Sequence, residues 1–187
     1  MRPLLTICCP SLLCRMQDST LIRQVHEQSH ATDGAAEFVV LADDMQIPLG
    51  TKMQQLYTFA RGQYVCSVAD DDTVSDDYVD ALLHAVGKGP DVVTFDVDWG
   101  AGDKVVVHPS PSTCDFRPMA VVRTEIAQEF DWPPWWRSED TAFKSWLRGR
   151  IRRQHKREHV KRVLYHYDFR VRKPEFGMQT YAPRKQA

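Results

Sequence analysis

The chain has 187 residues, of which 43% are hydrophobic and 10% aromatic, with 11 prolines and nine glycines. This length fits one domain spanning residues 1–187, and the composition excludes wholesale disorder and collagen-like repeats. No apolar run approaches the roughly 20 residues that a helix needs to cross a bilayer, so we expect no transmembrane helix.

The first apolar stretch, residues 4–14, has the charge and hydrophobicity of a secretory signal, but Pro10 interrupts it and no small-residue cleavage site follows. We interpret it as the first buried strand, with a signal peptide as the alternative. The cysteines form no C-x-x-C pair, which argues against a disulfide framework and a structural zinc site. They are Cys8, Cys9, Cys14, Cys66 and Cys114. A reducing, cytoplasmic location is therefore expected.

Short apolar runs typical of strands alternate with segments of helical periodicity along the chain, and this alternation predicts an α/β fold. The expected strands are residues 4–9, 37–42, 64–69, 91–97, 104–107 and 162–169. The expected helices are residues 18–28, residues 51–61 closed by Gly62, a third helix from its cap Ser75 to Gly87, and a fourth from Ser138 toward Ile151. Three β-then-α units in the first 90 residues imply a three-layer sandwich with a mainly parallel central sheet.

Ligands bind at the carboxyl ends of the strands in such a sheet. The residues at those ends are polar or turn-forming: Pro10 and Ser11, Asp43 and Asp44, and Asp70, Asp71 and Asp72. Neither G-x-G-x-x-G nor G-x-x-x-x-G-K-[ST] is present, so the sequence offers no dinucleotide fingerprint and no P-loop.

The acidic triplet Asp70, Asp71 and Asp72 is the first candidate for chemistry. Adjacent carboxylates repel one another, and a hard divalent cation such as Mg²⁺ or Mn²⁺ would neutralise them. The alternative is a solvated turn whose acids interact with the dipole of the following helix. A second pair, Asp96 and Asp98, is interpreted as an exposed strand end.

Histidines provide further candidate metal ligands. His155 and His159 have the spacing of ligands on one helix face, but no third ligand is evident and we assign them to the basic surface. His166, between two tyrosines, is either a buried hydrogen-bonded histidine or a late metal ligand.

Glu139 and Asp140 follow an aromatic stretch, residues 132–136, and lie in the first turn of the fourth predicted helix. Acids at that position commonly interact with the helix dipole. In a cleft lined by tryptophans, one of these carboxylates could instead act as a general base toward a hydroxyl group. The aromatic residues could form a platform for a sugar or a base, or part of the core.

The order of these features resembles the GT-A fold glycosyltransferases, particularly small family-2-like members. The matching strings are Leu5-Thr-Ile-Cys-Cys-Pro-Ser11 with Arg15, residues 37–44, Gly50-Thr-Lys52, Ala60-Arg-Gly-Gln-Tyr-Val65, the acidic triplet, Ser138-Glu-Asp140 and Val163-Leu-Tyr-His-Tyr167. The chain departs from the family pattern at Ala69, where a fourth acid is often found, and at Ser11, where Thr is frequent. The Gln-x-x-Arg-Trp motif of processive synthases is missing, because Glu158 follows Arg157.

The resemblance implies a GT-A-like, Rossmann-related fold and a nucleotide-sugar donor, with UDP as the expected nucleotide. By the same resemblance, Pro10, Ser11, Arg15 and Asp43 would hold the nucleoside, Lys52 would approach the donor, and Asp70, Asp71 and Asp72 would hold the diphosphate through Mn²⁺ or Mg²⁺, with His166 as a further metal ligand. Asp140, beside Glu139, would deprotonate the acceptor hydroxyl, with inversion at the anomeric carbon.

Charge is the main indication of the acceptor. Residues 141–187 carry 14 Lys and Arg against three acids, whereas residues 1–140 carry 10 against 22. With aromatic residues interleaved, such a segment is typical of nucleic-acid surfaces. We therefore hypothesise a polyanionic acceptor, a hydroxylated base in DNA of the kind that some bacteriophage enzymes glycosylate; a polyanionic glycan or a lipid acceptor would use the same charge, and the segment could equally fold against the acidic body. The other functions considered are a nucleotidyltransferase, a transferase that binds its donor without turnover, and a non-catalytic nucleic-acid-binding module.

Overall fold

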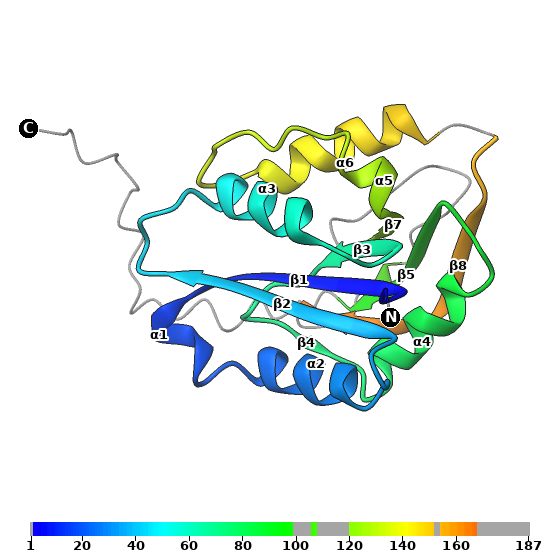
Figure 1. Cartoon of the computed structure of the whole chain (residues 1–187), viewed down its shortest axis with the longest axis horizontal. Helices are drawn as coiled ribbons and strands as arrows, with labels where there is room; N and C mark the ends of the chain where they lie inside the picture. The colour runs from blue at the N-terminus through cyan, green and yellow to red at the C-terminus, as the bar shows by residue number, and fades with distance from the viewer. Residues whose placement is uncertain (1, 99–105, 108–119, 152–153, 168–187) are drawn as a thin grey trace, which may run out of the picture.

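The computed structural model describes residues 2–98, 106–107, 120–151 and 154–167. The strands of the described residues form one sheet with helices on both faces (Figure 1). The strands are β1 (Leu5–Leu12), β2 (Ala36–Asp43), β3 (Tyr64–Ser67), β4 (Thr73–Val74), β5 (Val92–Asp98), β6 (Val106–Val107), β7 (Val121–Arg123) and β8 (Arg157–His166). The helices are α1 (Leu13–Met16), α2 (Thr20–His30), α3 (Leu49–Phe59), α4 (Tyr78–Val86), α5 (Thr124–Ala127) and α6 (Glu139–Arg150).

The sheet is mainly parallel, as predicted. In the described part of the chain the strand order is β2-β1-β3-β7-β5-β8-β4, with β6 paired to β5. The pairings of β1 with β2, β1 with β3 and β5 with β8 are parallel, whereas β7 is antiparallel to β3 and to β5. It follows that β1, β2, β3, β5 and β8 all run in one direction. Their carboxyl ends therefore lie along one edge of the sheet.

Strand β1 tolerates a proline although it lies between two other strands. Its pairing with β3 ends where Cys8 meets Ser67, whereas its pairing with β2 continues to Leu12. The backbone oxygen of Cys8 accepts a hydrogen bond from Val68 on the β3 side, and Pro10 has the same orientation two residues later. Pro10 therefore lies beyond β3, where the N–H group that it lacks has no ladder partner.

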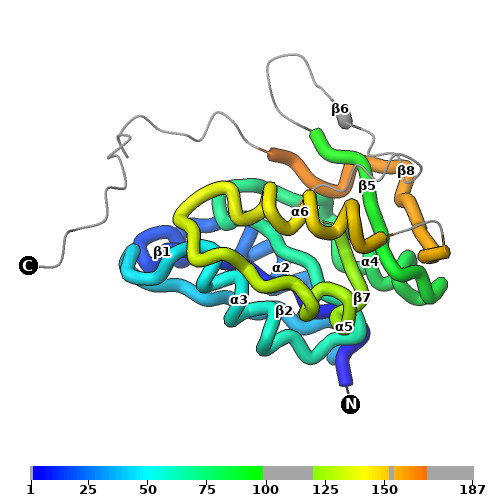
Figure 2. The backbone as a smooth tube through the Cα atoms, turned by 90° about the horizontal axis from the view of Figure 1, so that it is seen from above, coloured from blue at the N-terminus to red at the C-terminus, as the bar shows by residue number. Residues whose placement is uncertain are grey.

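Two apolar layers make the three-layer sandwich. One lies between the sheet and helices α2 and α4, with Leu21, Tyr78 and Leu82 fully buried. The other lies beneath α3, α5 and α6 and contains an aromatic cluster; Figure 2 shows these helices together over one side of the sheet. The cluster consists of Tyr57, Phe130, Trp132, Phe143 and Trp146. Trp132 is thus part of the core, while Trp135 is half exposed.

Helix boundaries differ from the predictions where a local signal had a different use. Helix α3 ends with its C-cap at Ala60, so Gly62 is not its cap; Gly62 instead lies against Thr6, whose backbone nitrogen would be 2.6 Å from an added Cβ. Helix α4 has its N-cap at Asp77 rather than Ser75, and ends at Gly87 as predicted. Ser138 is the N-cap of α6, as predicted.

The strand predictions were right for β1, β2, β3 and β5 apart from their ends. The last strand was placed too late: β8 begins at Arg157, five residues before the predicted start. His159 accordingly lies on a strand, which excludes a helical metal pair with His155. Four short elements, α1, β4, β7 and α5, were not predicted, because each has only two to four residues. Most of the predicted strand at 104–107, Cys114 and the chain after Tyr167 lie outside the described residues.

Candidate functional site

The predicted ligand edge gathers polar side chains from strands that are distant in sequence. Ser11 ends the buried part of β1, Asp43 ends β2, and the acidic triplet follows β3. Asp98 ends β5 and His166 ends β8. Because these strands are parallel, the structure brings the sequence candidates to one edge of the sheet.

Asp70 is held by residues from the end of β1 and the start of α1. Its Oδ2 accepts a hydrogen bond of 2.6 Å from Ser11 Oγ, and its Oδ1 lies 3.1 Å from Arg15 Nη1. Its backbone oxygen accepts a hydrogen bond of 2.7 Å from Ser19 Oγ, which also accepts the Ile22 N–H as the cap of α2. Ser11, Arg15 and Asp70, all candidates from the sequence, therefore form one connected group.

Arg15 bridges two acids of the triplet. Its guanidinium lies 3.6 Å from Asp71 Oδ2 in addition to its contact with Asp70. Partial burial opposes the charged form of Arg15, but the two carboxylates more than offset it and raise the pKa of Arg15 above its ordinary value. The guanidinium thus supplies the positive charge next to Asp70 and Asp71 in this structure.

Asp72 is held from the other end of the sheet. Tyr165 donates a hydrogen bond of 2.6 Å to Asp72 Oδ2 and accepts one of 3.0 Å from the backbone N–H of Ala69. Burial, and then the Asp72 charge, raises the pKa of Tyr165 well above its ordinary value, so the phenol stays protonated and able to donate. The antiparallel pairing of Thr73 with His166 brings β8 beside the triplet.

A buried ion pair joins the ends of β1 and β2. Lys52, from α3, contacts Asp43 Oδ1 and donates a hydrogen bond of 2.6 Å to the backbone oxygen of Ser11. Asp43 Oδ2 accepts the N–H groups of Gln46 and Ile47. Burial alone would raise the pKa of Asp43, but Lys52 and these two N–H groups outweigh it and lower that pKa. Lys52 therefore fixes the strand ends against each other.

Gly50 allows α3 to approach the segment that precedes α6. A Cβ at this position would lie 1.8 Å from the backbone oxygen of Pro133, and the Gly50 N–H donates a hydrogen bond of 2.9 Å to Trp135. Only a residue without a side chain permits this contact. It sets the start of α6 beside the helix that carries Lys52.

The two acids at the start of α6 have different environments. Glu139 is 7% exposed, and its Oε2 has no hydrogen-bond partner. Burial, followed by the charge of Asp140, raises the pKa of Glu139 although backbone N–H groups at the helix start oppose the shift. Asp140 is half-buried and its Oδ1 accepts the N–H of Thr141. Of the two, Asp140 is the one with access to solvent.

Metal binding has its candidate ligands here but not a complete set. Within the described ranges, no three His, Cys, Asp or Glu side chains converge closely enough to hold a metal ion. Both oxygens of Asp70 contact Ser11 or Arg15, and His166 Nδ1 lies 3.5 Å from Asp98 Oδ2. The carboxylate oxygens are nevertheless the donors that Mg²⁺ and Mn²⁺ prefer, and the carboxylate of Asp71 is 45% exposed. A cation would fit here if Arg15 moved.

The second acidic pair is not the exposed strand end that the sequence suggested. Asp96 is 4% exposed, and its Oδ1 lies 3.1 Å from His159 Nε2, while His159 Nδ1 lies 2.9 Å from Thr94 Oγ1. The prediction was wrong because it used alternation along one strand alone. The histidine that contacts Asp96 comes from a strand more than 60 residues later.

Sequence reasoning missed three contributors to the site. Tyr165 was noted only as part of a motif, Ser19 was not considered, and Gly50 was only part of a string. Each acts through a contact with a residue more than 50 positions away, so no local pattern marks it.

The sequence matches no protein-family model, and no curated protein sequence is significantly similar to it. Solved structures do match. Residues 1–349 of S. aureus TarS, crystallised with UDP-GlcNAc, align at a TM-score of 0.57 and 14% identity, over 87% of this chain and 57% of that one. Glucosyl-3-phosphoglycerate synthase from Mycobacterium tuberculosis, crystallised with Mn²⁺, UDP and phosphoglyceric acid, aligns at 0.62 and 13% identity, over 90% and 72% of the two chains.

These neighbours are GT-A-like glycosyltransferases, so the chain has the GT-A fold that the sequence predicted. It spans less than three fifths of the TarS fragment. The described residues contain no helix that is both long and apolar enough to cross a membrane.

Proposed function

We propose that this protein is a glycosyltransferase that takes its sugar from a nucleotide-sugar donor, with UDP as the nucleotide. The observation that carries the proposal is the connected group of Ser11, Arg15, Asp70 and the Lys52–Asp43 pair at the strand ends of a GT-A fold. Structures of the same fold have been crystallised with UDP-GlcNAc and with UDP, which supports the choice of donor.

In this proposal the donor lies across the strand ends. Pro10, Ser11, Arg15 and Asp43 bind the nucleoside, with Lys52 holding the two strand ends in register, and Asp71 faces the diphosphate. Asp70, Asp72 and His166 hold Mg²⁺ or Mn²⁺, and glucosyl-3-phosphoglycerate synthase has been crystallised with either ion. A divalent cation stabilises the charge that accumulates on a diphosphate leaving group. Arg15 then turns from the acids toward the phosphates.

Asp140 acts as the general base. Its position in the first turn of α6, half-buried and beside the contact between Gly50 and the loop before α6, gives it access to an incoming hydroxyl group. It removes the acceptor proton as the hydroxyl attacks the anomeric carbon in line, which inverts the configuration. Glu139, whose raised pKa favours the neutral form, stays beneath it as a support.

Nucleotide binding tests the donor site directly. We would record thermal unfolding with UDP, GDP, CDP and ADP, each with and without Mn²⁺, for the wild type and for Asp70→Asn. A ligand at about 100 times its Kd adds roughly 2.7 kcal/mol, or roughly 5–10 °C for a chain of this size. We expect the largest shift with UDP and Mn²⁺ and a smaller one in the variant. The absence of a shift with all four nucleotides would contradict the proposal.

The alternative reaction is nucleotidyl transfer, which also places acids at strand ends. The two reactions release different products: a glycosyltransferase releases a nucleoside diphosphate, whereas a nucleotidyltransferase releases pyrophosphate. Incubation with UDP-sugars, followed by separate assays for UDP and for pyrophosphate, distinguishes them. Pyrophosphate without UDP would replace our proposal with the alternative.

For the acceptor we propose a polyanion, with a hydroxylated base in DNA as the first candidate. The supporting observation is the charge of residues 141–187, of which Lys161 and Arg162 are exposed on β8. Binding driven by phosphate contacts weakens steeply as the salt concentration rises. Titration of hydroxymethylated duplex DNA at low and at physiological salt tests this. Equal affinity at both would exclude DNA, and binding without UDP release would favour the non-catalytic module.

A further inference from the structure

Strand β2 forms one end of the sheet. It pairs with β1 over all eight residues in an uninterrupted register, and no other strand of the described chain pairs with its second edge. A long, regular edge of this kind presents a row of backbone donors and acceptors to other chains.

The hydrogen bonds identify which residues point outward. The N–H of Leu5 donates to the backbone oxygen of Ala35, so Ala35 faces β1. Backbone groups alternate between the two edges of a strand, so those of Phe38, Val40 and Ala42 face away from β1. The N–H of Ala36, which has the same parity, donates to Thr32 Oγ1 rather than to β1.

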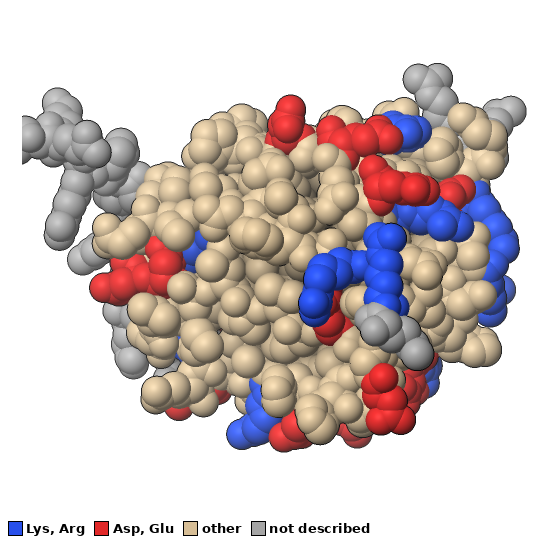
Figure 3. All heavy atoms as spheres, viewed as in Figure 1, with Lys and Arg blue, Asp and Glu red and all other residues tan. Residues whose placement is uncertain are grey.

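The side chains of β2 leave this edge unprotected. Phe38, Val39, Val40 and Leu41 are all only half-buried, and no charged residue lies between Glu37 and Asp43. Native edge strands are commonly protected by lysine, proline or a bulge, and β2 has none of these. In Figure 3 the centre of the face that looks toward the viewer is largely uncharged, with the charged side chains toward its rim.

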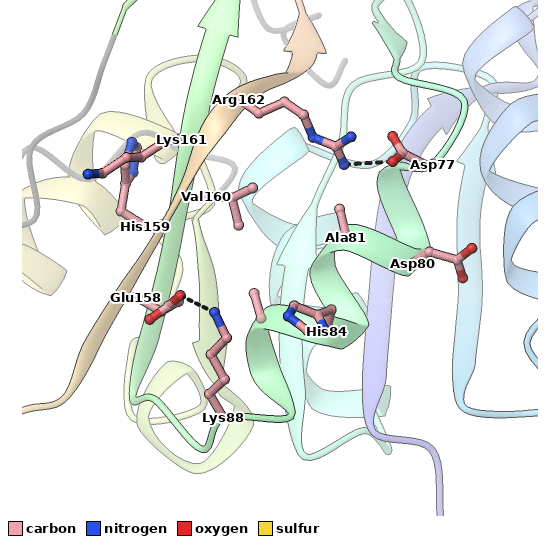
Figure 4. A pocket seen from close by; sticks show the side chains of 11 residues that line it. Asp77, Asp80, Ala81, His84, Lys88, Glu158, His159, Val160, Lys161 and Arg162 are labelled. Carbon is pink, nitrogen blue, oxygen red and sulfur yellow. Dashed lines mark hydrogen bonds and ion pairs between the residues drawn. The ribbon is translucent and has the colours of Figure 1, made fainter.

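The opposite end of the sheet is protected in both ways. Strand β4 has only two residues. Beside it, a groove of about 570 Å³ runs between α4 and β8 and is crossed by ion pairs of 2.6 Å, Arg162 with Asp77 and Lys88 with Glu158 (Figure 4). Charge and a short edge strand discourage pairing there, so the two ends of the sheet differ in the feature that controls association.

We propose that a second copy of this chain pairs with β2, antiparallel and related by a twofold axis, to form one continuous sheet. Opposite residues on antiparallel strands point to the same face, and Phe38 and Val40 share a face. An axis through Val39 sets Phe38 opposite Val40 of the second copy, and their outward N–H and C=O groups bond in pairs. An axis through Val40 would set Glu37 opposite Asp43, which like charges disfavour.

This pairing leaves both donor sites open. The site lies at the carboxyl end of β2, beside Asp43. Antiparallel strands place those ends on opposite sides of the twofold axis. The dimer and the transferase proposal are therefore independent, and either can fail without the other.

The oligomeric state of the full chain, measured by analytical ultracentrifugation over a range of concentrations, tests the proposal. We expect a dimer for the wild type and a monomer for Val39→Lys, since that substitution places two ammonium groups together at the axis. His84→Lys adds the same charge on the exposed surface of α4 and should remain a dimer. A wild type that is monomeric at every concentration, or a Val39→Lys variant as dimeric as the wild type, would overturn the proposal.

Amide hydrogen exchange gives a second test that needs no variant. The N–H groups of Phe38 and Val40 should be protected at concentrations that favour the dimer and lose protection on dilution, whereas the N–H of Val39, which faces β1, should stay protected. Protection of Phe38 and Val40 that does not change with concentration would mean that the chain covers its own edge, and the proposal would be wrong.

Discussion

The two halves of the candidate site are built differently. In the half made by β1, β2 and β3, buried partners come from the first 75 residues: Lys52 with Asp43, and Ser11 with Asp70. In the half made by β5 and β8, each partner comes from far along the chain, as when Tyr165 reaches Asp72. The first half can organise the donor side by itself, whereas the second depends on the last strand joining the sheet.

If this comparison is right, the largest effect of a single substitution should fall on turnover and not on donor binding. Asp140→Asn removes the proposed base and should lower kcat by about 10²–10⁴-fold. The UDP-induced thermal shift should stay unchanged, because Asp140 has no role on the donor side. Steady-state UDP release, measured beside that shift, checks both points. Unchanged turnover would remove Asp140 from the mechanism.

Lys52→Met should break the donor half most severely. It leaves Asp43 buried without its cation, and breaking a buried pair costs about 3–5 kcal/mol. The double variant Lys52→Met/Asp43→Leu should recover much of that loss. Arg162→Met is the matched control, because its pair with Asp77 is half exposed and should cost about 0–1 kcal/mol. Urea unfolding of all three variants measures these differences.

The same ion pair predicts a pH dependence. The pKa of Asp43 in the folded state lies below its ordinary value of 3.8. The stability that this lowered pKa contributes is therefore fully present above pH 3.8 and is lost as the pH falls through the folded value. Lys52→Met should flatten this part of the stability profile. A profile that keeps the wild-type slope would show that Lys52 does not set the pKa of Asp43.

Tyr165→Phe tests the long-range half. The variant removes the phenol that bonds Asp72 and the N–H of Ala69, and a buried group left without its partner costs about 1–3 kcal/mol. We also expect weaker Mn²⁺-dependent binding of UDP, since Asp72 loses its orientation. Tyr64→Phe is a control of the same chemistry, because its hydroxyl bonds the backbone of Pro90 and not the acids. Equal UDP affinity in both variants would confine Tyr165 to a structural role.

Arg15→Gln should separate the metal from the nucleotide. In the structure Arg15 occupies the acids that a cation would use, so its removal should strengthen the binding of Mn²⁺ alone several-fold. The same change should weaken UDP in the presence of Mn²⁺, because the guanidinium can no longer reach the phosphates. Isothermal titration of each ligand measures the two signs. Changes of the same sign for both would show that Arg15 does not exchange partners.

Glu139→Gln should have the smallest effect. Because the pKa of Glu139 is raised in the folded state, its ionisation costs stability at neutral pH, and that cost disappears as the pH falls through the folded value toward 4.5. The variant should be slightly more stable than the wild type at neutral pH and equal to it in acid. Thermal unfolding at several pH values measures the difference. A variant less stable at neutral pH would mean that the charged carboxylate is needed.

The sequence by itself determined the α/β class, the parallel sheet and the edge at which ligands bind. These follow from local patterns: apolar runs such as Leu5 to Cys9, helical periodicity, and polar residues where a run stops. The pattern also singled out Ser11, Arg15, Asp43, Lys52 and Asp70, which the structure joins by hydrogen bonds and ion pairs.

Only the tertiary structure decided which of these groups touch. Tyr165 holds Asp72 across 93 residues, and Gly50 admits a backbone that arrives more than 80 residues later. The burial of Asp96 and the open edge of β2 depend equally on which strand lies beside which. Such contacts are set by the packing of distant segments, whose free energy depends on burial and shape and leaves no periodic mark in the sequence around either partner.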